Sequence, residues 1–122
     1  MLIRYKASYE KIAMGLLSFM PQEKELKQLL KTMKQYEEND DWKLYLWREG
    51  DDIIGIAGLY YCDDQHAQLT HICVNPSHRH LGVGRKIVQA LTQFVDDVTI
   101  IPNEQTKNFF DRCLNVVGNE SL

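Results

Sequence analysis

The sequence predicts one α/β domain with a mixed, twisted sheet, mostly antiparallel with a central parallel pair, flanked by about four helices. The first observation is a meander of apolar stretches between residues 42 and 74, separated by short polar turns. The second is an apolar-striped helix that follows this meander and leads to the short apolar run 98–101. Strands joined through a helix run parallel, so the last two strands should form the parallel pair.

The composition limits what this domain binds. The 122 residues suffice for one core, so residues 1–122 are expected to form a single domain. With 14 Lys and Arg against 17 Asp and Glu, the net charge is -3, which gives no polycationic surface for nucleic acid. The 3 cysteines lack C-x-x-C spacing, which argues against a disulfide framework or a zinc site. No apolar run has the length of a signal peptide or membrane span, so we expect a soluble, cytoplasmic protein.

The N-terminal third should contain a strand and two helices. Residues 1–5 form a short apolar run, and Ser8 is suited to cap a helix that a proline ends. Gly15 in the middle of this helix favours a close packing contact. Residues 22–38 should form the second helix, and its charged residues, including Glu23, are interpreted as a solvated face.

The same patterns predict the later elements. Gly50 lies in a polar stretch that is typical of a hairpin turn. Phe109, Phe110 and Cys113 should face inward from the last helix. The elements expected after the first two helices are strands 42–47, 53–61 and 68–74, helix 83–95, strand 98–101 and helix 103–114.

A basic, glycine-bearing loop joins the third meander strand to the next helix, with the sequence Val74-Asn75-Pro76-Ser77-His78-Arg79-His80-Leu81-Gly82-Val83-Gly84. The first amides of a helix have no carbonyl partners within it, and the helix dipole makes this end positive, so anions bind there. Gly82 and Gly84 lack the Cβ atoms that would hold a phosphate away from the backbone. Further positive charge comes from Arg79, His80 and Arg85. The stretch therefore predicts a diphosphate-binding loop.

Two common nucleotide-binding motifs do not fit this loop. A Walker loop needs Lys and Ser or Thr after its last glycine, whereas Gly84 is followed by Arg85-Lys86-Ile87. A dinucleotide fingerprint needs a third glycine at the position of Ile87. What remains is Arg79-x-x-Gly82-x-Gly84 between an apolar strand and an amphipathic helix.

This arrangement closely resembles motif A of the GCN5-related N-acetyltransferase (GNAT) superfamily, which is Arg/Gln-x-x-Gly-x-Gly/Ala after an apolar strand. The order of the elements also matches, and Asn103-x-x-Thr106-x-x-Phe109-Phe110 is similar to the family's Asn-x-x-Ala-x-x-Phe-Tyr segment. The resemblance implies acetyl-CoA as cofactor, with strand backbone on its pantetheine arm and loop amides on its pyrophosphate. The residues implied to bind acetyl-CoA or CoA are Ile72, Cys73, Val74, Arg79, His80, Leu81, Gly82, Val83, Gly84, Arg85 and Asn103.

A narrower resemblance concerns residues 11–21 and 74–80. These stretches are similar to small acetyltransferase-like proteins encoded with the riboflavin biosynthesis genes of bacilli. The resemblance runs over most of the chain and implies a link between the acceptor amine and riboflavin biosynthesis.

Two departures from the family pattern concern catalysis and closure of the fold. The family's tyrosine, placed to protonate the departing CoA thiolate, is replaced by Phe110, which has no proton to give. The chain ends soon after the last helix, a shortened C-terminus that leaves little sequence for the hairpin that usually closes the fold. We therefore expect an exposed sheet edge, which favours a homodimer.

The general base is also missing from its usual place. Family enzymes often carry a glutamate on the motif A strand, whereas this strand carries Gln68, Thr70 and His71. His71 is the candidate base because imidazoles titrate near neutral pH, and a packing role is the alternative. By strand alternation Cys73 should lie on the opposite face from Thr70 and Ile72, which argues against a nucleophilic role.

Other candidate residues have weaker support. His66 lies in a turn with two aspartates and is interpreted as solvated. Tyr60 and Tyr61 are alternatives for the missing acid, although most strand tyrosines are packing residues. His78 and His80 are interpreted as phosphate ligands, and no metal is expected because no third ligand is evident nearby.

Two functional hypotheses remain at this point. The preferred one is an acetyl-CoA-dependent N-acetyltransferase that acts on a small-molecule amine by direct attack in a ternary complex. The alternative is a CoA-binding regulatory or structural module with weak or no catalysis. Both predict CoA binding, and the first alone predicts release of the free thiol.

Overall fold

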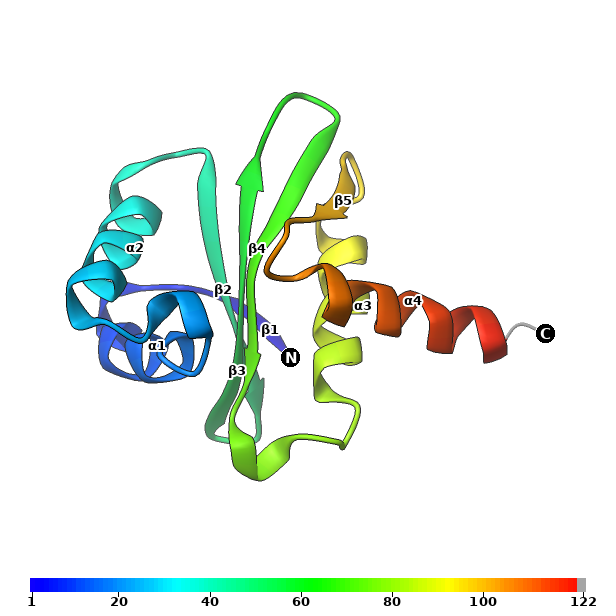
Figure 1. Ribbon diagram of the computed structural model, residues 1–122, viewed down its shortest axis with the longest axis horizontal. Coiled ribbons are helices and arrows are strands. Elements are labelled where there is room, and N and C mark those ends of the chain that lie inside the picture. The colour runs from blue at the N-terminus through cyan, green and yellow to red at the C-terminus, as the bar shows by residue number, and fades with distance from the viewer. Residues whose placement is uncertain (121–122) are drawn as a thin grey trace.

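The computed structural model of the protein describes the backbone of residues 1–120 and the side chains of residues 1–113. Within these residues, a 5-stranded sheet has the order β1-β2-β3-β4-β5; β4 and β5 are parallel and the other neighbours antiparallel. The predicted mixed sheet is therefore confirmed (Figure 1). The elements are β1 (Leu2–Arg4), α1 (Glu10–Leu17), α2 (Leu26–Glu38), β2 (Trp42–Glu49), β3 (Asp52–Tyr61), β4 (His66–Val74), α3 (Val83–Phe94), β5 (Thr99–Pro102) and α4 (Lys107–Glu120).

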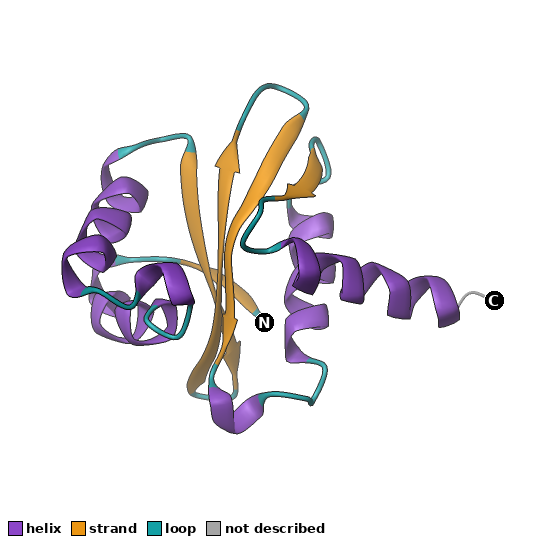
Figure 2. Cartoon of the chain, in the orientation of Figure 1, coloured by secondary structure: helices purple, strands orange, loops and turns teal. Residues whose placement is uncertain are grey.

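The helices divide between the two faces of the sheet. α1 and α2 cover one face, and α3 and α4 lie on the other (Figures 1 and 2). Each face has its own apolar core, with Leu46 and Ile56 packed toward α1 and α2, and Leu69 and Ile87 on the opposite side. Burial on both faces explains why β3 is apolar at every position after Asp52.

The two parallel strands pair over only part of β4. Residues His66 to Leu69 pair with Thr99 to Pro102, and β4 then continues to Val74. In the described chain, the stretch from Thr70 to Val74 therefore has no strand partner on the β5 side. This leaves an opening in the sheet directly before the glycine-bearing loop.

A β-bulge interrupts the side-chain alternation of β4. Gly58 pairs with His71 and Leu59 pairs with Leu69, so Thr70 is the extra residue. Thr70 and His71 consequently lie on the same face, where both contact Tyr36 of α2. A regular strand would have placed these two side chains on opposite faces.

The bulge corrects the prediction for Cys73. The sequence placed Cys73 opposite both Thr70 and Ile72. Ile72 does pack toward α3, but Cys73 belongs to the core under α1 and α2, the same face that Thr70 occupies. The prediction was wrong for Thr70, because strict alternation does not hold across a bulge.

Helix α1 begins and packs differently from its prediction. Residues Ala7–Tyr9 form a 3-10 turn, α1 begins at Glu10, and no side-chain hydrogen bond caps either start. Ser8 is therefore not the predicted cap. A Cβ at Gly15 would meet no atom within 4 Å, so the predicted close packing contact is also wrong.

The second helix starts later than predicted. Residues Pro21–Glu23 form a separate 3-10 turn, η2, and α2 begins at Leu26. Proline at the first position is compatible with such a turn, because the first amide of a helical turn has no partner within it. Glu23 is 2% exposed, so its prediction as part of a solvated face was wrong.

Candidate functional site

The loop between β4 and α3 has the backbone shape of an anion site. The Asn75 side-chain oxygen accepts a hydrogen bond from the Ser77 amide at 3.0 Å, which begins a 3-10 turn. His80 (φ 66°) and Gly82 (φ 78°) have left-handed backbone, and α3 starts directly after Gly82. Loops that switch between left- and right-handed residues make concavities lined by amides, and here one lies at a helix N-terminus.

The two glycines of this loop have different roles. Gly82 needs its positive φ, and a Cβ there would point into open space. A Cβ on Gly84 would lie 2.1 Å from the Phe109 ring of α4. The absent side chain of Gly84 therefore lets α4 pack against α3, and the space expected to admit a phosphate contains the Phe109 ring.

A cavity of about 600 Å³, here called the loop cavity, lies beside this loop. The turn after α1 forms one wall, the unpaired end of β4 forms the floor, and α4 closes the far side. The lining residues are Phe19, Met20, Pro21, Ile72, Cys73, Val74, His78, Arg79, His80, Gly82, Val83, Gly84, Arg85, Gln105, Phe109, Arg112 and Cys113.

The charge of the loop cavity is complementary to an anion. Arginine side chains come from the loop, from α3 and from α4, and two histidines add further donors. Among the described residues that line it, none is Asp or Glu. The protein as a whole has a net charge of -3, so this basic lining is a local feature.

Most of the residues predicted to bind a cofactor line the loop cavity. Leu81 is not among its lining residues and is 65% exposed. Asn103 lines a different cavity, and its side-chain oxygen accepts from the Thr106 amide at the start of α4. The structure brings together the other predicted residues, namely Ile72, Cys73, Val74, Arg79, His80, Gly82, Val83, Gly84 and Arg85.

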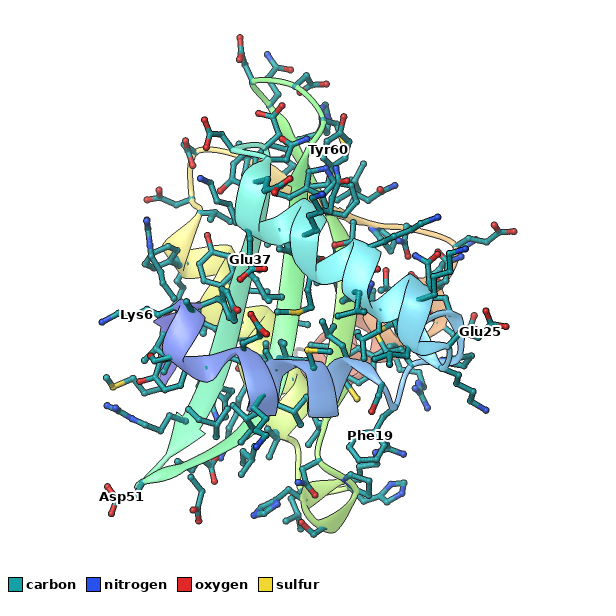
Figure 3. The ribbon with its side chains drawn as sticks, turned by 90° about the vertical axis from the view of Figure 1, so that its left-hand side faces the viewer. Lys6, Phe19, Glu25, Glu37, Asp51 and Tyr60 are labelled. Carbon is teal, nitrogen blue, oxygen red and sulfur yellow. The ribbon has the colours of Figure 1, made fainter. Side chains whose placement is uncertain are left out.

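The Arg79 side chain spans the loop cavity between two of its walls. Its Nε donates to the Val74 carbonyl at 3.1 Å, and its guanidinium lies 5.7 Å from the centre of the Phe19 ring. Figure 3 shows Phe19 near the end of α1, on the side toward the loop. The contacts of Arg79 therefore connect the α1 turn to the end of β4.

A second cavity of about 450 Å³, here called the polar cavity, lies on the face covered by α2. It shares Gln105 with the loop cavity, and the two meet along β4, where His71 lines one and Ile72 the other. The remaining lining is rich in carboxamides: Gln22, Glu23, Gln28, Lys31, Thr32, Gln35, Trp42, Gln68, Thr70 and Asn103.

His71, the predicted base, lies in the polar cavity with both ring nitrogens occupied. The side chain is 6% exposed. Nε2 is 3.2 Å from Glu23 Oε1, and Nδ1 is 2.5 Å from the Tyr36 hydroxyl. The Tyr36 hydroxyl is also 2.5 Å from Thr70 Oγ1.

Glu23 is the site residue that sequence reasoning missed. Its carboxylate accepts from the Thr32 hydroxyl at 2.7 Å and lies against His71, although 48 residues separate it from His71 in the chain. A carboxylate removed from water needs such partners. Its burial depends on the η2 turn and on this long-range contact, which helical periodicity does not report.

Tyr36 reaches β4 because Gly58 leaves room for it. A Cβ on Gly58 would overlap the Tyr36 hydroxyl oxygen. Burial is the main cause that raises the pKa of Tyr36, so this hydroxyl remains protonated. Tyr36 lies within the predicted second helix 22–38, and sequence reasoning missed its hydroxyl chemistry.

The weaker candidates lie elsewhere. Tyr60 packs against Trp42, with ring centres 5.0 Å apart, at the end of the sheet opposite Phe19 (Figure 3). Tyr61 lies near Tyr45 on the other face of β3. His66 pairs with Asp63 in the exposed β3–β4 turn at 3.1 Å. None of Tyr60, Tyr61 and His66 is among the described lining of either cavity.

The cysteines and Phe110 are placed as follows. Cys73 and Cys113 are buried and line the loop cavity, and burial raises the pKa of both thiols. Phe110 is 8% exposed and belongs to the core between α4 and the sheet.

In the described part of the chain, no group of three or more His, Cys, Asp or Glu side chains is arranged to hold a metal, and no helix is long and apolar enough to cross a membrane.

A parallel strand pair that opens beside a basic helix N-terminus is an arrangement that suits a ligand with phosphate groups. The model of the acetyltransferase (GNAT) family matches residues 11–114. An uncharacterized N-acetyltransferase from the lysA 3' region of Bacillus methanolicus is 52% identical over 120 residues, which cover 98% of this chain and 100% of the relative. The chain belongs to the GNAT family, whose members are acyltransferases with acetyl-CoA as the standard cofactor.

Solved structures share the fold. The aminoglycoside acetyltransferase AAC(6')-Iy, in complex with a bisubstrate analogue of CoA, superposes with a TM-score of 0.73 at 15% identity, covering 96% of this chain and 87% of that one. A GNAT family acetyltransferase from Staphylococcus aureus superposes with a TM-score of 0.67 at 19% identity, covering 84% of this chain and 83% of that one. A possible acetyltransferase from Clostridium difficile superposes with a TM-score of 0.72 at 13% identity, covering 94% of this chain and 88% of that one.

Proposed function

We propose that this GNAT protein transfers the acetyl group of acetyl-CoA to a primary amine of a small molecule by direct attack in a ternary complex. The observation that carries the proposal is the junction of two cavities of opposite character on one strand. The loop cavity has an anion-binding wall, and the polar cavity has hydrogen-bonding groups. Where they meet, β4 has unpaired backbone and presents His71.

The loop cavity fits the cofactor by charge and by backbone. Its basic lining and the amides at the start of α3 suit a diphosphate, and the free edge of β4 suits an extended chain that bears amides. When bound there, acetyl-CoA supplies an activated acetyl thioester. The residues proposed to hold it are the predicted residues that line this cavity, from Ile72 to Val74 and from Arg79 to Arg85 without Leu81.

His71 is proposed as the group that receives the amine proton. It lies where the polar cavity approaches the β4 edge, and its Nε2 lies 3.2 Å from Glu23 Oε1. Phe110 is packed in the core and provides no acid. The proton that His71 gains is therefore also the proton available to the products.

The acceptor is proposed to be a small, hydrogen-bonding amine that carries little positive charge. Six carboxamide side chains line the polar cavity, with one lysine, and its single carboxylate in the described chain, Glu23, already has two partners. The link to riboflavin biosynthesis is the narrower form of this proposal, and the resemblance of residues 11–21 and 74–80 supports it.

The cofactor part of the proposal is tested by calorimetry with CoA. Substitution Gly82→Val forces a β-branched residue into a left-handed conformation and should weaken CoA binding at least about tenfold. Gly15→Ala is the matched control, because its Cβ meets open space in α1. Circular dichroism verifies that both variants remain folded. An unchanged CoA affinity in Gly82→Val would contradict the loop assignment.

The catalytic part is tested by a screen of primary amines with acetyl-CoA and a thiol-detecting reagent. The panel contains flavin precursors, amino sugars, amino acids, polyamines and peptides. We expect acetyl-CoA-dependent thiol release with a neutral, polar acceptor and little with polyamines. Silence across the panel with CoA binding intact would favour the binding module instead.

Assembly and location complete the proposal. β1 and β5 are the outer strands of the sheet, and an outer strand is the usual site for pairing with a second copy. We propose a homodimer, which sedimentation analysis distinguishes from a monomer by mass.

The free cysteines Cys62, Cys73 and Cys113 suit a reducing compartment, which supports a cytoplasmic location.

A further inference from the structure

Four side chains form a continuous buried chain of hydrogen bonds on the α2 face of the sheet. Thr70 Oγ1 lies 2.5 Å from the Tyr36 hydroxyl, which lies 2.5 Å from His71 Nδ1. His71 Nε2 lies 3.2 Å from Glu23 Oε1. Thr32 donates to the same carboxylate at 2.7 Å, which fixes the carboxylate from the other side.

The geometry determines which atom carries each proton. A carboxylate is an acceptor, so Nε2 of His71 donates to Glu23, and a neutral imidazole then has an acceptor at Nδ1. The Tyr36 hydroxyl consequently donates to Nδ1 and, having a single proton, accepts from the Thr70 hydroxyl. Thr70 Oγ1 has no other hydrogen-bond partner among the described residues, and Thr70 lines the polar cavity, so the lone pairs of this hydroxyl are available there.

Both nitrogens of His71 are thus engaged, and an amine in the polar cavity reaches the imidazole only through other groups. Accordingly, and as a deepening of the proposed function, we propose that the hydroxyls of Thr70 and Tyr36 relay the acceptor's proton to His71, while Glu23 is the positioning residue that holds the imidazole tautomer.

The relay balances the protons of the transfer. As the amine nitrogen forms its bond to the acetyl carbon, it gives one proton to Thr70. Thr70 passes its own proton to Tyr36, Tyr36 passes its proton to His71 Nδ1, and the imidazolium is stabilised by Glu23. The C–S bond breaks, the proton returns along the same hydroxyls to the thiolate, and the products are the amide and the free thiol.

Two irregular features of the sheet serve this arrangement. The bulge at Thr70 turns its hydroxyl to the same face as His71. The glycine at position 58 leaves the space that the Tyr36 hydroxyl occupies, since any larger residue there would overlap it. A bulge and a glycine each weaken a central strand. If these positions served core packing alone, apolar side chains in place of the hydroxyls would serve as well.

The kinetic test compares Thr70→Val and Tyr36→Phe with wild type, using acetyl-CoA and D-glucosamine as a small polar amine. Each variant removes one hydroxyl and keeps the side-chain shape. We expect kcat to fall about a hundredfold or more with little change in the KM for acetyl-CoA, because general-base assistance contributes on this scale. The matched controls are Thr92→Val and Tyr5→Phe, whose hydroxyls bond Val88 and Glu37 outside both cavities.

Two further measurements separate a relay from a structural role. The solvent-isotope proton inventory should be curved in wild type and linear in Thr70→Val, because several protons move together only in the intact relay. Imidazole nitrogen NMR of the ligand-free protein should show His71 protonated at Nε2, a preference that Glu23→Gln weakens and Tyr36→Phe keeps. A proton on Nδ1 in wild type would overturn the relay.

The outcomes also distinguish this relay from the function it depends on. Wild-type turnover with undiminished rates in Thr70→Val and Tyr36→Phe overturns the relay and leaves the acetyltransferase proposal intact. A wild type that binds CoA but is silent with D-glucosamine and with every other amine of the panel overturns both.

Discussion

At the scale of single residues, the candidate site depends on the absence of a side chain at position 58. Gly58 lies opposite His71 in the sheet, and the hydroxyl of Tyr36 fills the volume that a Cβ would need. Tyr36 also packs edge-on against the rings of Trp42 and His71, with centres 5.4 Å and 5.5 Å apart. The tyrosine is therefore held by its ring and by its hydroxyl.

A first prediction concerns this contact. Gly58→Ala should destabilise the protein by about 1–3 kcal/mol, because Tyr36 must move out of a packed core. Urea unfolding measures the change. Gly15→Ala is the matched control and should stabilise by about 0.5–1 kcal/mol, because alanine favours a helix interior and its Cβ meets no neighbour. Equal stability of both variants would show that Tyr36 does not occupy the space above Gly58.

The residue scale is also where the sequence was least informative about the site. His71 was recognised as a candidate base because its own side chain suggests proton transfer. Glu23 was not, because its burial results from a 3-10 turn and a contact across 48 residues, which local periodicity does not report. Thr70 was placed on the wrong face relative to Cys73, because a one-residue bulge at Thr70 leaves no sequence signal that alternation detects.

At the scale of elements, the start of α4 links the two cavities. The amide of Thr106 donates to the Asn103 side chain at 2.9 Å, and the amide of Asn103 donates to Thr106 Oγ1 at 3.0 Å. This is the reciprocal arrangement of a capping box. The Thr106 hydroxyl further donates to the Leu69 carbonyl at 2.7 Å, so the cap fastens α4 to β4 where β5 stops pairing.

A second prediction tests this cap. Thr106→Val keeps the side-chain volume but removes the hydroxyl from a position that is 0% exposed. We expect a loss of about 1–3 kcal/mol in the free energy of unfolding, since buried backbone groups of Asn103 and Leu69 lose their partner. Thr92→Val, at an exposed position of α3, should change stability by less than about 0.5 kcal/mol. A similar small effect of both variants in urea unfolding would contradict a capping role.

Elements with strong periodicity were predicted well from the sequence. The helix from Val83, the hairpin at Gly50 and the parallel pair follow from apolar spacing, turn chemistry and chain order, all of which are local. The start of α2 was not predicted well, because both a long amphipathic helix and a turn followed by a helix fit the sequence of residues 22–38. Tertiary contacts of Glu23 decide between them.

At the scale of the whole molecule, β4 separates two kinds of chemistry. The basic cavity proposed for CoA lies at the open end of β4, between the turn after α1 and α4, and the α2 side of β4 contains the polar cavity and the buried hydroxyls. The family relation accounts for the first, since motif A is the stretch on which the resemblance rests. The second contains the residues of the proposed proton relay, which come from η2, α2 and β4.

A third prediction uses the cysteines as reporters of the loop cavity. Cys62 is exposed, whereas Cys73 and Cys113 are buried and line that cavity. Burial raises the pKa of both buried thiols, and the thiolate is the reactive form, so at pH 8 both should react with iodoacetamide more slowly than Cys62. Their rates should increase as the pH rises past 9.0, the ordinary thiol value.

Saturating CoA should then protect Cys73 and Cys113, and leave Cys62 unchanged, in peptide-resolved mass spectrometry. In Gly82→Val, which we expect not to bind CoA, the protection should disappear. Protection of all three cysteines, or of Cys62 alone, would place CoA outside the loop cavity. The same reactivity requires that thiol release be measured in a Cys62→Ser background, because an exposed protein thiol consumes the detecting reagent and would mimic the product of acetyl transfer.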